Sequence, residues 1–143
     1  MNTNIINARE AVRLLFETYP PVRHDAWFPI LFCGDRLSCC DEAAIAEVNE
    51  KIAALATIAP EGEMEEGRPT IVGLYTVRLF RRRGFGKAVL EAAVRRCLSR
   101  GFSHIRVDAI SPNAMKTIQS LSEELQAELT VSDQSMFGGG ILD

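Results

Sequence analysis

A strand, a basic turn with two glycines and an amphipathic helix follow one another without interruption between residues 70 and 100. The run Thr70–Val77 is rich in β-branched residues, which favour strands. After Lys87 the apolar residues recur at helical spacing, and this stripe consists of Val89, Leu90, Ala93, Val94, Cys97 and Leu98. A strand that leads through such a turn into a helix is typical of α/β domains, so we expect a fold of that class.

The remaining chain extends this order on both sides. Before it, we expect a helix from about residue 8 to Tyr19, capped by Asn7, and an antiparallel hairpin of Ala43–Asn49 and Lys51–Pro60. After it, we expect a strand over His104–Ile110 and then a helix that begins at Ser111-Pro112 and buries Met115, Ile118, Leu121 and Leu125. Two final strands are expected over Ala127–Ser132 and Met136–Leu142. The apolar segment 26–33 fits a helix or a strand equally well. The sequence therefore predicts one α/β (α+β) domain over residues 1–143, with a mixed, mostly antiparallel sheet and helices on both faces.

Composition excludes several classes of protein. No stretch approaches the roughly 20 uncharged apolar residues of a membrane span, and the polar start has no leader-like pattern. The four cysteines form no C-x-x-C pair, and the two histidines are isolated, so we expect reduced thiols, a cytoplasmic location and no metal site.

The net charge of −3 conceals two unlike halves. Residues 1–67 hold 5 basic and 12 acidic groups, whereas residues 68–143 hold 11 basic and 7 acidic groups. A basic half suits a polyanionic ligand and an acidic half suits a cationic one, although such segregation is also common on solvated surfaces. We expect the acidic loop Glu61–Glu66 to lie at the mouth of a cleft and to attract a cationic acceptor.

The turn Arg81–Lys87 has the features of an anion-binding site. A helix start offers unpaired main-chain N–H groups and a positive dipole end, and Gly84 and Gly86 leave room for a pyrophosphate. Arg81, Arg82, Arg83 and Lys87 add positive charge, which is unfavourable at a helix start without an anion. The alternative is a solvated basic turn.

Two other glycine motifs fit this turn less well. A P-loop requires glycine at position 81 and serine or threonine at position 88, where this chain has Arg81 and Ala88. The run from Arg83 to Gly86 matches the start of an RNA-recognition pattern, but the following residues have helical spacing and not the aromatic strand that stacks bases. An RNA-binding module is a minor alternative, and we expect no nucleic acid partner.

The segment from Leu74 to Arg100, with Arg81-x-x-Gly84-x-Gly86 at its centre, resembles motif A of the GNAT superfamily of acetyltransferases. The resemblance extends over about residues 43–121. It implies that acetyl-CoA is the co-substrate, that main-chain amides of Arg82–Lys87 hold its pyrophosphate, and that the strand end pairs with its pantetheine arm. The implied coenzyme-binding residues are Tyr75, Thr76, Val77, Arg81, Arg82, Arg83, Gly84, Phe85, Gly86, Lys87 and Ser111.

The implied reaction is acetyl transfer to an amine of a small or peptidic acceptor, with a strand amide near Tyr75 or Thr76 stabilising an oxyanion. The chain departs from the family pattern at two positions. Ile118 occupies the position where many members carry a tyrosine that acts as the general acid, and Ser111 occupies the position of an asparagine. Tyr75 is the candidate acid, or only a packed strand residue, and Asp108 is a candidate base, or only the partner of Arg106. A non-catalytic coenzyme-binding module is the main alternative, and homodimer formation stays open.

Overall fold

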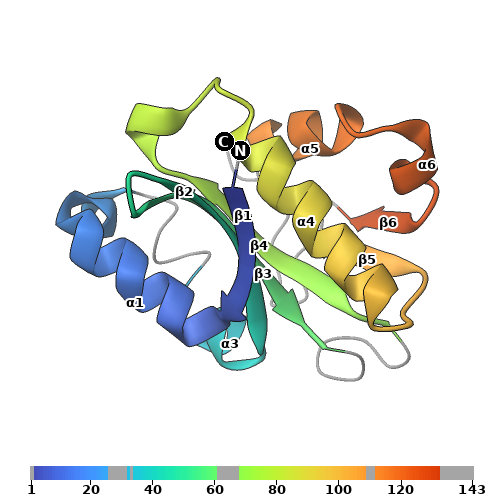
Figure 1. The fold of residues 1–143 in the computed structure, drawn as a ribbon. Coiled ribbons are helices and arrows are strands. Elements are labelled where there is room, and N and C mark those ends of the chain that lie inside the picture. The colour runs from blue at the N-terminus through green and yellow to red at the C-terminus, as the bar shows by residue number, and fades with distance from the viewer. Residues whose placement is uncertain (1, 26–31, 33, 61–67, 109–111, 133–143) are drawn as a thin grey trace.

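Six strands pair in chain order in one sheet (Figure 1). The protein is described by a computed structural model over residues 2–25, 32, 34–60, 68–108 and 112–132. The strands are β1 (Asn2–Asn7), β2 (Glu42–Val48), β3 (Lys51–Ala59), β4 (Thr70–Thr76), β5 (Ile105–Asp108) and β6 (Leu129–Ser132). Pairing is antiparallel from β1 to β4 and parallel from β4 to β6, which confirms the predicted mixed, mostly antiparallel sheet.

Helices cover both faces of this sheet, as predicted. Their bounds are α1 (Ala8–Thr18), the 3₁₀ turn η1 (Pro20–His24), α3 (Asp35–Ser38), the 3₁₀ turn η2 (Arg78–Phe80), α4 (Phe85–Ser99), α5 (Pro112–Gln119) and α6 (Glu123–Gln126). In Figure 1, α1 lies on one side of the sheet and α4 and α5 lie on the other. No helix in the described part of the chain has both the length and the apolar character of a membrane span.

The alanines of the central hairpin explain how α4 packs. Because successive side chains of a strand point to opposite faces, β2 and β3 contribute to two cores. Ile45 and Leu55 belong to the core beneath α1. The core beneath α4 instead contains the small residues Ala44, Ala46, Ala54 and Ala56 together with Val89, Leu90 and Ala93 of the helix. Small side chains on that face let the helix lie close to the strands.

The edge strand β1 was not predicted from the sequence. Four of its six residues are Asn or Thr, and its two isoleucines, Ile5 and Ile6, are adjacent and only partly buried, so the strand shows no alternating buried stripe. It pairs with β2 through its main chain, from Asn2↔Glu47 to Asn7↔Glu42. The predicted cap at Asn7 is confirmed, because its Oδ1 accepts a hydrogen bond from the Glu10 N–H at 3.1 Å.

The helix predicted to follow Ser111 is correct in position but wrong in continuity. It ends at Gln119, and a separate helix, α6, starts after Ser122, whose Oγ accepts a hydrogen bond from the Leu125 N–H at 3.3 Å. Leu121 and Leu125 are buried as predicted. The predicted strand Met136–Leu142 lies outside the described residues.

The pairing of β4 with β5 is short, and this opens the sheet at one end. The two strands share only the pairs Thr70↔Arg106 and Ile71↔Val107. From Gly73 to Thr76 the described partner of β4 is β3 alone. One edge of β4 therefore stays available just before the turn that leads to α4.

Candidate active site

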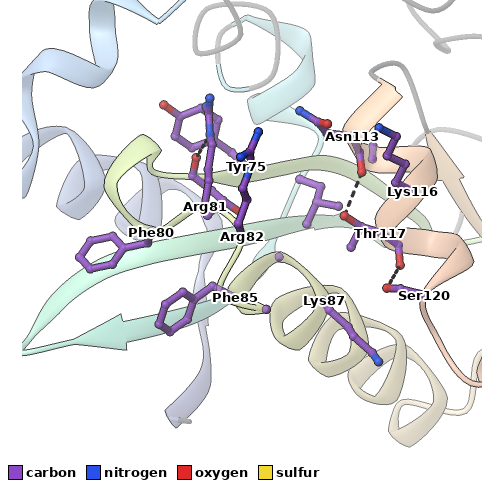
Figure 2. Close-up of a pocket in the computed structure, with 15 residues that line it drawn as sticks. Tyr75, Phe80, Arg81, Arg82, Phe85, Lys87, Asn113, Lys116, Thr117 and Ser120 are labelled. Atoms are coloured by element: carbon purple, nitrogen blue, oxygen red, sulfur yellow. Dashed lines mark hydrogen bonds between the residues drawn. The ribbon is translucent and has the colours of Figure 1, made fainter.

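A pocket of about 560 Å³ lies beside this edge of β4. It is lined by Leu74, Tyr75, Thr76, Phe80, Arg81, Arg82, Gly84, Phe85, Gly86, Lys87, Asn113, Ala114, Lys116, Thr117 and Ser120. Figure 2 shows Arg81 and Arg82 on one side, polar side chains of α5 on the other, and Lys87 on α4 between them. The pocket thus brings β4, the basic turn and two helix starts together.

The turn before α4 leaves three main-chain donors available. Gly84 is the N-cap of α4 and adopts a left-handed conformation with φ +83°, which glycine reaches without steric cost. The first hydrogen bond of the helix runs from the Ala88 N–H to the Gly84 carbonyl at 3.0 Å. The N–H groups of Phe85, Gly86 and Lys87 precede that bond and have no partner within the helix. All three residues line the pocket.

Gly86 is required for a contact between helix and strand as well as for room at the helix start. A Cβ atom at this position would lie 3.1 Å from Thr76 Oγ1 and 3.9 Å from Thr117 Oγ1. The first distance is shorter than an ordinary van der Waals contact. The glycine therefore lets α4 begin directly against β4, which the sequence analysis did not anticipate.

The lining is electrostatically one-sided. Among the described residues, it includes the cationic side chains of Arg81, Arg82, Lys87 and Lys116 and no acidic side chain. Because the available amides and the positive end of the helix dipole lie on the same side, the field of the pocket favours a polyanion.

Strand alternation fixes which amides of β4 face the pocket. The Val77 N–H donates to the Ala53 carbonyl of β3 at 2.8 Å. Main-chain groups two residues apart point the same way, so the amide of Tyr75 also faces β3. The amides of Leu74 and Thr76 then face the open edge. Of the two predicted oxyanion donors, only the Thr76 amide has this orientation.

Tyr75 lies between two pockets and anchors a polar cluster. Its hydroxyl donates to Asp25 Oδ2 at 2.9 Å, and Arg81 Nη2 donates to the same oxygen at 3.1 Å. Arg81 Nε also donates to the Thr76 carbonyl at 3.0 Å. Burial, and then the hydrogen bond to Asp25, raise the pKa of the Tyr75 phenol well above its ordinary value. Tyr75 also lines a second pocket, of about 300 Å³, that includes Asp25.

Several predicted site residues do not line the larger pocket. Arg83 instead lies over the ring of Phe80, with Cζ 5.8 Å from the ring centroid, and Val77 lines the second pocket. Ser111 lies outside the described residues. So does the loop 61–67.

Asp108 lines neither pocket. Its Oδ1 accepts a hydrogen bond from Arg106 Nε at 2.8 Å, and its side chain is fully buried. This geometry favours the structural alternative, a strand-end carboxylate paired with Arg106. Among the described residues, no group of three His, Cys, Asp or Glu side chains is arranged to hold a metal ion.

The polar face of α5 was missed from the sequence. Asn113, Lys116, Thr117 and Ser120 recur at helical spacing and all line the pocket. The analysis used the apolar stripe of this helix and ignored the opposite stripe, which carried the signal. Asp25 was missed for another reason. It meets Tyr75 across 50 residues of chain, and no local pattern encodes that contact.

Comparison with known proteins agrees with this geometry. A family model described as the acetyltransferase (GNAT) family matches residues 8–119, which is most of the chain. The chain belongs to the GNAT acetyltransferase family. The resemblance seen in motif A is therefore confirmed. A comparison with curated proteins finds no significant match.

Solved structures support the GNAT fold. A ribosomal-protein-alanine N-acetyltransferase from Brucella melitensis biovar Abortus 2308 is 15% identical, with a TM-score of 0.57 over 86% of this chain and 94% of that one. An aminoglycoside acetyltransferase from an uncultured soil metagenomic sample, in complex with sisomicin, is 17% identical, with a TM-score of 0.58 over 83% of this chain and 85% of that one. At these identities the likeness concerns the GNAT fold alone.

Proposed function

We propose that this GNAT protein is an acetyl-CoA-dependent N-acetyltransferase that acts on an amine of a small or peptidic acceptor. The observation that carries the proposal is the larger pocket, whose described lining places four cationic side chains and no acidic one around a helix start and an open strand edge. This donor set suits a ligand with a pyrophosphate and an amide-containing arm. A cytoplasmic location and a homodimer stay predictions of the sequence.

Residues of the turn and of β4 would hold the coenzyme. The amides of Phe85, Gly86 and Lys87 are suited to the pyrophosphate oxygens, and the Arg82 side chain adds charge beside them. The available edge of β4 at Leu74 is suited to an amide group of the pantetheine arm, as an added strand would be. Acetyl-CoA supplies an acetyl thioester, whose acetyl group is transferred to the acceptor nitrogen.

Tyr75 is the residue that we assign to the leaving sulfur. Its raised pKa means that the hydroxyl remains protonated at neutral pH and can donate a proton. That proton goes to the sulfur as the carbon–sulfur bond breaks. The acceptor nitrogen loses one proton to solvent as its bond to the acetyl carbon forms, and solvent returns a proton to the Tyr75 oxygen. The Thr76 amide, which faces the open edge, is suited to the carbonyl oxygen.

One observation favours a second candidate function, coenzyme binding without turnover. Ile118, at the position where many GNAT members carry the acidic tyrosine, is 3% exposed and packs in the core beneath α4. If Tyr75 cannot reach the sulfur, the described residues offer no other tyrosine at the larger pocket.

Two adjacent arginines give a matched test of the coenzyme site. Arg82 lines the pocket and Arg83 does not. We expect Arg82→Gln to weaken coenzyme A binding, measured by calorimetry, about tenfold, because a charge-assisted hydrogen bond contributes about 1.5–3 kcal/mol. Arg83→Gln should change it less than about threefold. Equal losses would refute this placement of the pyrophosphate.

Turnover is tested separately. Acetyl-CoA is incubated with a panel of alkylamines, polyamines, aminoglycosides, amino acids and peptides, and the released thiol is measured. Acetyl transfer to any amine, lost in Tyr75→Phe while coenzyme binding is retained, would support the enzyme. Binding without thiol release from every amine would favour the second candidate.

A further inference from the structure

A second pocket lies on the other side of Tyr75 from the basic turn. It has a volume of about 300 Å³ and is lined by Tyr19, Pro21, Val22, His24, Asp25, Tyr75, Val77, Arg78 and Leu79. This volume is at the lower end of the range of small-molecule sites. Tyr75 lines both pockets, and Arg81 of the larger pocket binds Asp25 of the smaller one. The two pockets therefore meet at one cluster of side chains.

The second pocket differs from the larger one in its charge. Of the residues that the structure describes, Asp25 is the one carboxylate in its lining, and the lining of the larger pocket has none. The Asp25 side chain is 11% exposed, and its Oδ2 is fixed by hydrogen bonds from Tyr75 and Arg81. A carboxylate held in one orientation at the floor of a small pocket is suited to the ammonium group of an amine.

The surroundings of Asp25 also limit how much positive charge a ligand can carry. Arg81 already offsets the charge of Asp25. Arg78 lines the pocket, and no described carboxylate forms an ion pair with it. Lys51 Nζ lies 5.5 Å from the ring centroid of Tyr19, another lining residue. Within the described lining, the positive charge of Arg78 therefore offsets the negative charge of Asp25, which disfavours a second cationic group on the ligand.

The rest of the lining is apolar. Pro21, Val22 and Val77 form part of the wall, the ring of Tyr19 adds an aromatic face, and Leu79 is 70% exposed at this site. Exposed apolar side chains at a pocket favour a ligand that covers them. An alkyl or aralkyl group beside the amine would do so.

We propose that the second pocket binds the acceptor, that Asp25 binds the acceptor's ammonium group and takes up one proton from it, and that the acceptor class is a small amine with one positive charge and an apolar or aromatic substituent. The proposal rests on the N-acetyltransferase function. The proton passes from the ammonium nitrogen to a carboxylate oxygen of Asp25 and then to solvent, and leaves a neutral amine beside Tyr75. Only the neutral amine carries the lone pair that acetyl transfer requires.

The test compares amines on the coenzyme-free protein, so its first readout does not depend on turnover. We would measure binding of 2-phenylethylamine, the uncharged analogue 2-phenylethanol and the polycation spermidine by calorimetry. Asp25→Asn is the test variant, since asparagine keeps an oxygen that can accept from Tyr75. Asp35→Asn is the matched control, because Asp35 is exposed on α3 and lines neither pocket.

We expect Asp25→Asn to weaken 2-phenylethylamine binding about tenfold, the loss of one charge-assisted hydrogen bond, and to leave 2-phenylethanol binding within about twofold. Asp35→Asn should change neither, and Asp25→Glu should recover part of the loss. Spermidine should bind more weakly than 2-phenylethylamine, and Arg78→Gln should narrow that difference. Unchanged amine binding in Asp25→Asn, or tighter binding of spermidine to the wild type, would overturn the proposal.

A second readout tests the proton transfer. In 2,2-difluoro-2-phenylethylamine the fluorine atoms make the ammonium more acidic, so a larger fraction is neutral at neutral pH. The loss of kcat in Asp25→Asn should be smaller with this amine than with 2-phenylethylamine, and an equal loss would contradict proton uptake by Asp25. Coenzyme A binding is measured in each variant. If it is absent from the wild type, the N-acetyltransferase proposal fails, whereas intact coenzyme binding with amine binding independent of Asp25 refutes only this inference.

Discussion

Substitution of Gly86 tests how closely α4 must approach β4. Gly86→Ala adds one Cβ atom, which would lie 3.1 Å from Thr76 Oγ1. Two effects oppose each other. Alanine in place of glycine within a helix stabilises it by about 1 kcal/mol, whereas inserting a group into a packed contact costs about 1–3 kcal/mol. Because Thr76 lies on a strand paired on its other side with β3, we expect the packing cost to exceed the helix gain.

The expected net result is a loss of about 1 kcal/mol in the free energy of unfolding, or about 3 °C in Tm for a chain of this length. The contact partner gives a clean control. In a Thr76→Ala background the hydroxyl is absent, so Gly86→Ala should become neutral or stabilising. A double-mutant cycle measured by urea denaturation should therefore show a coupling of about 1–2 kcal/mol between the two positions.

The wild type, the two single variants and the double variant also separate an effect on helix packing from an effect on coenzyme A binding. If Gly86 is also needed for the approach of a pyrophosphate, Gly86→Ala should weaken coenzyme A binding by calorimetry in both backgrounds. If only the helix position matters, the double variant should recover wild-type affinity. A destabilisation by Gly86→Ala that is the same with and without the Thr76 hydroxyl would refute the packing argument. Gly86→Val is less informative, because its larger side chain disturbs the strand and the ligand together.

Three further predictions concern other parts of the chain. Gly84→Ala should lower the free energy of unfolding by about 1 kcal/mol, because φ +83° is strained for a residue with a Cβ. Gly84→Asn should lower it less, and a comparison of Tm values would show the difference. The folded pKa of Tyr75 is raised, so its contribution to stability is present below pH 10 and is lost as the pH rises further. Urea denaturation of Tyr75→Phe should therefore show a weaker fall in stability above pH 10 than the wild type does. Burial raises the pKa of the Cys97 thiol to about 11, so a thiol reagent at pH 8 should leave Cys97 unmodified until the protein unfolds. Peptide mapping after the reaction checks this, and modification of Cys97 in the native protein would contradict its burial.

Local patterns were sufficient for the part of the fold to which we assign coenzyme binding. The strand Thr70–Thr76, the glycine turn and α4 each follow from residues close in sequence, because β-branched runs, left-handed glycines and apolar stripes act over one or two turns of chain. The hairpin turn at Asn49 and Glu50 is of the same kind. Both residues have positive φ, of 50° and 66°, as a two-residue turn between antiparallel strands requires.

The elements missed depend on tertiary contacts or on main-chain pairing. Edge strand β1 pairs through its main chain, and its two isoleucines are adjacent, so its side chains give no alternating pattern. The break between α5 and α6 depends on the cap at Ser122, which competes with continued helix in a stretch whose apolar spacing fits both. These are cases in which local propensity and final structure diverge, because a hydrogen bond outside the pattern determines the outcome.

The alternation of β4 explains how a strand tyrosine can serve a site that many GNAT proteins complete from a helix. The side chain of Thr76 contacts the start of α4, while Tyr75 packs in the core beneath α1, so consecutive residues address opposite faces of the sheet. In the proposal above, the groups that bind the coenzyme and the groups that bind the acceptor are therefore separated by a single strand. Tyr75 lines both pockets, so a proton donor placed there can serve the sulfur from the acceptor's face, where α5 offers only the buried Ile118 at the usual tyrosine position. In the proposed mechanism, the hydrogen bond from the Tyr75 hydroxyl to Asp25 therefore holds the proton donor in place at the junction of the two pockets.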